Sequence, residues 1–171
     1  VRMLLKDLRS ALDRGVRIRI LTGNYLGITQ PSALYLIKKE LGGRVDLRLY
    51  NDKQRSFHPK SYIFHSKETS EIYIGSSNVS RSALTSGIEW NYRFTREADP
   101  RNFNLFYETF EDLFFNHSIL VDDEELCRYS KNWHRPSIYK DLNRYDSHDG
   151  EQGNKVENLF QPRGAQIEAL Y

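Results

Sequence analysis

Two short apolar runs separated by a polar stretch constrain this 171-residue chain more than any other feature of its sequence. Residues 61–64 and 71–75 are rich in β-branched and aromatic side chains, as strands are. The polar residues 66–70 between them suit a turn, so the whole segment is predicted to form a β-hairpin. An antiparallel hairpin returns to the end where it began, so the residues before its first strand lie near those after its second.

Chemically versatile side chains flank this hairpin. His58 and Lys60 precede its first strand and, because they are two residues apart in an extended chain, they point to the same side. Asn78 follows the second strand, and Glu89 begins a further strand predicted over residues 89–94. An imidazole can attack phosphorus, an ammonium and a carboxamide can hold the non-bridging oxygens, and a carboxylate can fix the imidazole tautomer. Together these residue types favour phosphoryl transfer without a metal. For Glu89 alone, a simple salt bridge is the alternative interpretation.

Three segments of the sequence, residues 56–62, 74–84 and 87–91, resemble the phospholipase D superfamily. The residues that carry the likeness are His58-x-Lys60, Gly75-Ser76-x-Asn78 and Glu89. Together the segments resemble the phospholipase D-like domain that precedes bacterial superfamily 2 helicases, over roughly positions 3–116. The resemblance implies an α/β fold, a phospholipase D-like layered domain with a mixed β-sheet flanked by helices.

The resemblance also implies a role for each motif residue. His58 is the expected nucleophile, and a covalent phosphohistidine is the expected intermediate. Lys60 and Asn78 are expected to stabilise the transferred group, and Glu89 is expected to orient the imidazole. Ser76 is expected to contact phosphate.

One position departs from the superfamily pattern. The usual aspartate, five residues after the lysine, is His65 here. His65 is five residues after Lys60, and an odd spacing along a strand places two side chains on opposite faces. His65 is therefore a poor candidate for a second catalytic histidine beside Lys60. A subfamily of metal-independent restriction nucleases also lacks a strict aspartate, so activity stays the hypothesis.

Three basic side chains are candidates for phosphate or DNA contact. Lys53 and Arg55 lie in the polar loop 51–57 just before His58, where phosphate contact and simple solvation are equally open interpretations. Arg81 lies shortly after the second motif, and its interpretation as a phosphate ligand or as a surface arginine is open in the same way.

Outside the hairpin, the sequence predicts alternating helices and strands. The predicted helices and strands outside the hairpin cover residues 3–15, 16–21, 31–41, 45–50 and 100–115. Arg17 and Arg19 are expected on a solvated strand face, with DNA contact as the less favoured interpretation, and Trp90 is expected in the core. Tyr25 follows a strand end of the kind where α/β sheets bind ligands, and it is interpreted as a packing residue. A strand expected ahead of the first helix is missing and Val1 is not a methionine, so the chain is interpreted as a fragment.

Composition narrows the function classes. The net charge is only +2, so a nucleic-acid surface must be local. No apolar run approaches the ~20 residues of a membrane span and no signal peptide opens the chain, which predicts no membrane partner. The single Cys127 fits a reducing compartment, so the expected location is the cytoplasm. His117, His134 and His148 lack ligand-like spacing, so no metal site is predicted.

The chain is predicted to contain more than one domain. Residues 1–136 form the phospholipase D-like domain, and the polar stretch within 137–158 is a linker. Residues 159–171 resemble the opening of a superfamily 2 helicase core, in which Gln166 would contact adenine. No Gly-rich phosphate loop is present, so ATP and Mg would serve only the absent helicase core, and no cofactor is expected in this chain.

The function predicted is a metal-independent DNA nuclease domain, a phosphodiesterase normally attached to a helicase. A catalytically silent DNA-binding module is the alternative, because a fold alone does not determine function. A phospholipid phosphodiesterase is less favoured. The reaction needs a second proton-transfer group, and the sequence has one His-x-Lys motif, so a homodimer with facing His58 residues is predicted.

Overall fold

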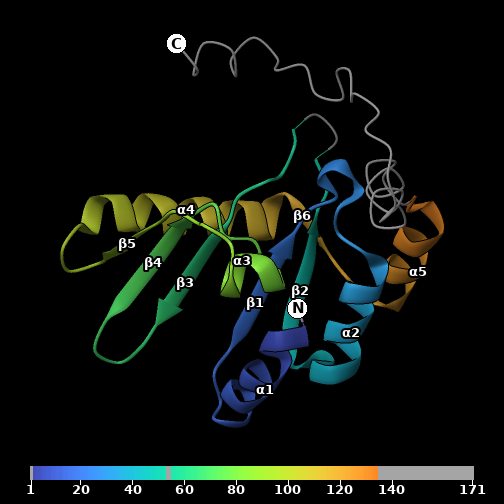
Figure 1. The fold of residues 1–171 in the computed structure, drawn as a ribbon, viewed down its shortest axis with the longest axis horizontal. Helices are drawn as coiled ribbons and strands as arrows, with labels where there is room; N and C mark the ends of the chain where they lie inside the picture. The colour runs from blue at the N-terminus through green and yellow to red at the C-terminus, as the bar shows by residue number, and fades with distance from the viewer. Residues whose placement is uncertain (1, 53–54, 135–171) are drawn as a thin grey trace, which may run out of the picture. The chain divides into compact units, whose positions relative to one another are not determined.

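The computed structural model describes residues 2–52 and 55–134, which contain alternating helices and strands (Figure 1). The elements are η1 (Arg2–Leu4), α1 (Leu5–Asp13), β1 (Ile18–Thr22), η2 (Tyr25–Gly27), α2 (Pro31–Leu41), η3 (Gly42–Arg44), β2 (Val45–Tyr50), β3 (Ser61–His65), β4 (Ser70–Gly75), α3 (Arg81–Thr85), β5 (Asn91–Thr95), α4 (Pro100–Asn116), β6 (Ser118–Leu120) and α5 (Asp123–Asn132). The predicted linker 137–158 and the predicted helicase segment 159–171 lie outside the described residues.

The strands form two sheets of three strands each. In the first, β1 pairs in parallel with β2, from Ile18 opposite Val45 onward, and β2 pairs antiparallel with β6. In the second, β3, β4 and β5 are antiparallel, and Tyr73 lies opposite both Tyr62 and Arg93. The predicted hairpin is therefore β3–β4, and the α/β class with a mixed sheet is confirmed.

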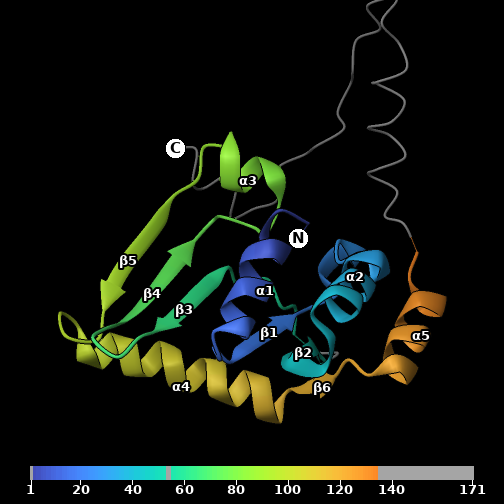
Figure 2. The ribbon, with the colours of Figure 1, turned by 90° about the horizontal axis from the view of Figure 1, so that it is seen from below.

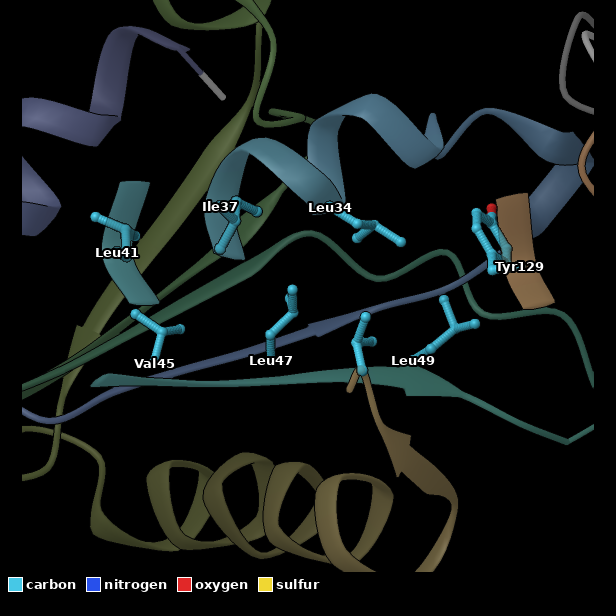
Figure 3. Packing of buried hydrophobic residues seen from close by; sticks show 8 residues of the cluster. Leu34, Ile37, Leu41, Val45, Leu47, Leu49 and Tyr129 are labelled. Atoms are coloured by element: carbon cyan, nitrogen blue, oxygen red, sulfur yellow. The ribbon is translucent and has the colours of Figure 1, made fainter. Parts of the chain in front are cut away.

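The core of the first sheet lies between β2 and the helices α2 and α5 (Figure 3). Strand β2 alternates buried and half-buried residues, and its buried side chains face α2. The buried residues of this cluster are Leu34, Ile37, Leu41, Val45, Leu47, Leu49, Val121 and Tyr129. Pro31 begins α2, where its missing N–H has no helical partner to lose, and Gly42 ends it with a φ of 63°.

Helix α4 covers a face of both sheets (Figure 2). Under the second sheet, Phe103 is fully buried together with Ile72 and Phe94. Under the first sheet, the Arg19 guanidinium lies 2.6 Å from Glu111 of α4 and 5.2 Å from the centre of the Phe110 ring. The expectation that Arg19 lies on a solvated face was wrong, because α4 covers that face and supplies a carboxylate to the arginine.

Candidate active site

The three predicted motif segments meet at one end of the second sheet. The Gly75 N–H donates to the carbonyl of Lys60 at 3.1 Å, which extends the β3–β4 pairing toward His58. Gly75 also lies opposite Asn91 at the start of β5. A Cβ on Gly75 would lie 2.0 Å from the Trp90 carbonyl oxygen, so glycine allows β5 to approach this closely. The antiparallel return of the hairpin is confirmed, and a position of Asn78 close to His58 and Lys60 stays a prediction.

His58 and Lys60 are in direct contact. The Lys60 ammonium nitrogen lies 3.0 Å from His58 Nδ1 and 3.1 Å from Nε2, and it donates to the His58 carbonyl at 3.2 Å. Nearly equal distances to the two ring nitrogens place the ammonium over the ring, not in line with one lone pair. A fixed positive charge therefore sits beside an exposed imidazole.

The segment that carries His58 also packs against the C-terminal ends of β1 and β2 and the residues that follow β1. The Tyr25 ring lies 4.5 Å from the His58 ring, with the two planes tilted by 41°. Phe57 stacks on Tyr50 at the end of β2, with ring centres 4.9 Å apart. Gly23, beyond the end of β1, is so close to Phe57 that an added Cβ would lie 2.9 Å from the Phe57 side chain. The candidate site therefore lies where the two sheets adjoin.

Glu89 contacts the second motif. The Ser76 hydroxyl donates to the Glu89 carboxylate, and it accepts from the Trp90 N–H at 3.0 Å. The Ser76 N–H donates in turn to the Trp90 carbonyl at 2.9 Å. Within the described part of the chain, Glu89 is bonded to Ser76 and not to His58, so its action on the imidazole stays a prediction. Phosphate contact by Ser76 stays a prediction as well.

Two residues without a predicted role hold the turn between β4 and Asn78. The Tyr62 hydroxyl donates to the Ser77 carbonyl at 2.8 Å, and the Asn91 amide donates to the Ser77 hydroxyl at 2.7 Å. Burial and the nearby charge of Glu89 raise the pKa of Tyr62, which keeps its hydroxyl a donor at neutral pH. The alternation of positions 58, 60 and 62 on one strand face could have identified Tyr62 from the sequence.

The sequence also predicts phosphate contact by Asn78, Arg55, Arg81 and Lys53. The Asn78 side chain is exposed, and the backbone carbonyl of Asn78 accepts from the Ser80 N–H at 2.8 Å. Arg55 is largely exposed and lies 4.0 Å from the Asp52 carboxylate. Arg81 begins α3, at the end of the sheet that carries the motifs (Figure 2), but its side chain lies outside the described structure, as does Lys53. Phosphate contact by these residues stays a prediction.

His65 lies on the other face of the second sheet, against α4. Its ring lies 5.2 Å from Tyr107 and 6.1 Å from Phe103, and its Nδ1 is 3.0 Å from the Ser70 hydroxyl. Burial, followed by the charges of Arg96 and Arg19, lowers the pKa of His65. The prediction that His65 faces away from Lys60 is confirmed, and a neutral imidazole packed on a helix cannot take part in chemistry at the site.

Trp90 was predicted to be part of the core, and this prediction was wrong. Its side chain is 83% exposed, although its backbone is bonded to Ser76. Tyr92, on the same side of β5, is also exposed and stacks on Phe94. Strand alternation indicates which side a residue faces, but it does not show whether another element covers that side.

The described residues include neither a cluster of metal-ligating side chains nor a membrane-spanning helix. No group of three or more histidine, cysteine, aspartate or glutamate residues is arranged to hold a metal ion among them. None of the described helices combines the length and the apolar character needed to cross a lipid bilayer.

Comparison with known proteins identifies the family. A family model described as "Cardiolipin synthase, PLD-like domain" matches residues 1–114. A search of curated proteins finds no match. The matched range contains all the motif segments and both three-stranded sheets except β6. The chain therefore belongs to the phospholipase D-like domain family, whose members are generally phosphodiesterases.

Proposed function

We propose that this domain is a metal-independent phosphodiesterase that cleaves DNA through a phosphohistidine intermediate. The observation that carries the proposal is the Lys60 ammonium 3.0 Å from the His58 imidazole, at the sheet end that also presents Asn78. A nucleophile and a fixed cation at one exposed point suit an anionic phosphodiester.

The proposed reaction has two displacements at phosphorus. A ring nitrogen of His58 attacks, so that a P–N bond forms while the P–O bond to the leaving strand breaks. Lys60 and Asn78 stabilise the charge on the non-bridging oxygens, and an acid protonates the leaving oxygen. Water then attacks phosphorus and breaks the P–N bond, and its proton passes to the same group, now acting as a base.

The proton-transfer group in this scheme comes from a second copy of the chain. His65 packs against α4, and His117 lies 3.4 Å from the Asp112 carboxylate at the end of that helix. A homodimer with a two-fold axis beside His58 would bring a second imidazole to the phosphate. Mixing native protein with excess His58→Ala protein should therefore give heterodimers that are inactive or stop after the first step. Sedimentation of a monomer that cleaves DNA over many turnovers would contradict the homodimer.

DNA is the favoured substrate because the motif segments resemble helicase-associated domains, and the proposal includes attachment to a helicase and a cytoplasmic location. Two other functions have an observation in their favour. His65 in place of an aspartate favours a catalytically silent DNA-binding module. The family description names a cardiolipin synthase, which favours a phospholipid phosphodiesterase.

The decisive experiment measures DNA cleavage in excess chelator by three proteins: native, His58→Ala and His134→Ala. His134 is an exposed histidine after α5, so its variant controls for the substitution itself. We expect cleavage by the native and His134→Ala proteins and none by His58→Ala. DNA binding without cleavage by all three would favour the silent module, and head-group release from phospholipid vesicles without DNA cleavage would favour the phospholipid enzyme.

A further inference from the structure

We propose that Tyr25 is a positioning residue for His58, and that helix α5 holds Tyr25 in place through residues 23–29, here called the Tyr25 loop. The proposal rests on the proposed function only in naming His58 as the nucleophile. The contact itself joins two distant parts of the chain, the loop after β1 and the segment before β3.

Tyr25 limits the orientation of the imidazole from a different part of the chain, the loop after β1. Lys60 also touches the ring, but it belongs to the same segment as His58, so it does not hold the ring against a separate part of the domain. Glu89, the residue expected to orient the ring, is bonded to Ser76. The Tyr25 ring, 4.5 Å from the imidazole at a tilt of 41°, is therefore the rigid surface against which His58 rests.

The Tyr25 loop is closed on itself. The Thr29 hydroxyl donates to the Gly23 carbonyl at 2.6 Å, which ties the end of the loop to its beginning. Gly27 has a φ of 67°, a conformation that favours glycine, where the chain turns after Tyr25. Gly23 also presses on Phe57, the residue before His58. The loop therefore contacts the nucleophile segment at two adjacent residues.

Two aromatic side chains near the end of the described chain hold this loop in place: Tyr129 in α5 and Trp133, the residue after α5. The Tyr129 hydroxyl lies 2.8 Å from the Asn24 side-chain oxygen and 2.8 Å from the Thr29 carbonyl. The Trp133 indole N–H donates to the Gly27 carbonyl at 2.7 Å. Tyr129 is buried in the core of the first sheet, and burial raises its pKa to about 12, so the hydroxyl keeps its proton at neutral pH. These bonds connect the core to the loop on both sides of Tyr25.

A chain of contacts thus runs from Tyr129 and Trp133 through the loop to Tyr25 and on to His58. Each step is a hydrogen bond or a ring contact between packed groups, so loosening the first step frees the last. Substitutions in α5 should therefore change the reactivity of His58, although α5 does not touch the imidazole.

The first test measures His58 itself and needs no catalysis. Native protein and variants react with diethyl pyrocarbonate, and peptide mass spectrometry follows the modification rate of each histidine. We expect Tyr25→Ala to raise the rate at His58 several-fold, Tyr25→Phe to leave it within twofold, and Tyr129→Phe to give an intermediate rate. His65 is the internal reference, because an unchanged rate there shows that the fold is intact.

The second test measures cleavage of a DNA oligonucleotide in excess chelator. Tyr25→Ala should lower kcat about tenfold with KM within twofold, since binding of the phosphate is left to other residues. Tyr25→Phe should stay within twofold of native, and adding Tyr129→Phe to Tyr25→Ala should lower kcat no further, because both act through one contact.

Native values of both the modification rate and kcat for a folded Tyr25→Ala protein would overturn the proposal. A rise in KM alone would also overturn it, because it would make Tyr25 a substrate-binding residue. If native protein shows no cleavage in chelator, the proposed nuclease function fails, and the modification rates still decide the role of Tyr25 in holding the imidazole.

Discussion

The two sheets of this domain differ in how much of each is buried. The first sheet contributes to a core of eight buried residues with α2 and α5 on one face and has α4 on the other. The second buries three residues, Ile72, Phe94 and Phe103, against α4. On its other face, which carries His58 and Lys60 at one end, Phe64 is 55% exposed. Buried side chains are therefore concentrated at the first sheet, and the proposed chemistry lies at the second.

This division has a physical reason. A phosphodiester can reach a nucleophile only where side chains are not covered, so the site must occupy a poorly buried part of the molecule. Such a part is held in place by a better packed neighbour, and here the Tyr25 loop makes that connection. Substitutions at the sheet end should change activity without changing stability, and substitutions in β2 should change stability.

The largest expected effect is on activity at the second sheet. Lys60→Met removes the fixed charge beside the imidazole while keeping much of the side-chain volume, so cleavage in chelator should fall on the order of 10³-fold. Lys67→Met, in the exposed turn between β3 and β4, is the matched control and should cleave like native protein. Equal rates for the two variants would show that Lys60 does not stabilise the reacting phosphate.

The next effect is on stability and contrasts the two sheets directly. Leu47 is 3% exposed in the first core, so Leu47→Ala should lower the free energy of unfolding by about 2–5 kcal/mol. Phe64→Ala, on the open face of the second sheet, should lower it by no more than about 1 kcal/mol. Urea denaturation followed by circular dichroism measures both. A larger loss for Phe64→Ala would mean that the open face is a second core.

A smaller effect concerns DNA binding near the site. Arg55 is largely exposed, so one lost phosphate contact should weaken binding of Arg55→Ala alike for all sequences and reduce the salt slope by about one. Arg14→Ala, beyond α1 at the opposite end of β1, is the control for net charge. Fluorescence anisotropy at several salt concentrations gives the slopes. Identical slopes for the two variants would exclude Arg55 from the DNA surface.

The smallest effect is a pH dependence of stability from His65. Because its pKa is lowered in the folded state, the unfolded chain binds the proton more readily. The stability gained by keeping His65 neutral is present above its ordinary pKa of about 6.5 and is lost as pH falls through that value toward the lowered one. His65→Gln should flatten the stability curve below neutral pH, as measured by thermal unfolding. An unchanged acid slope would contradict this.

Local patterns in the sequence predicted the parts of the fold that depend on neighbouring residues. Alternation and polar turns identified the β3–β4 hairpin, which the structure confirms. The two-residue spacing of His58 and Lys60 predicted that both side chains point to the same side, and in the structure they are in contact. The motif pattern also placed Glu89 at the same sheet end, where it meets Ser76. These features follow from strand periodicity and antiparallel return.

Long-range contacts could not be predicted in this way. Arg19 has its partner on α4, and Tyr25 meets His58 across the two sheets, because helices and loops distant in sequence pack there. Trp90 is exposed, although Phe94 on the same side of β5 is buried against α4, and periodicity cannot reveal where along a strand the cover ends. Each of these positions depends on tertiary packing, and a single sequence carries no direct signal of it.

Detection of the covalent intermediate tests the proposed phosphohistidine mechanism most directly. Native protein and labelled DNA are mixed in excess chelator and quenched in alkali, in which a phosphohistidine P–N bond survives, and the digested protein is then examined by mass spectrometry. We expect a nucleotide adduct on the peptide that contains His58, present with His134→Ala and absent with His58→Ala. Cleavage of DNA without any adduct, or an adduct on a different residue, would contradict it.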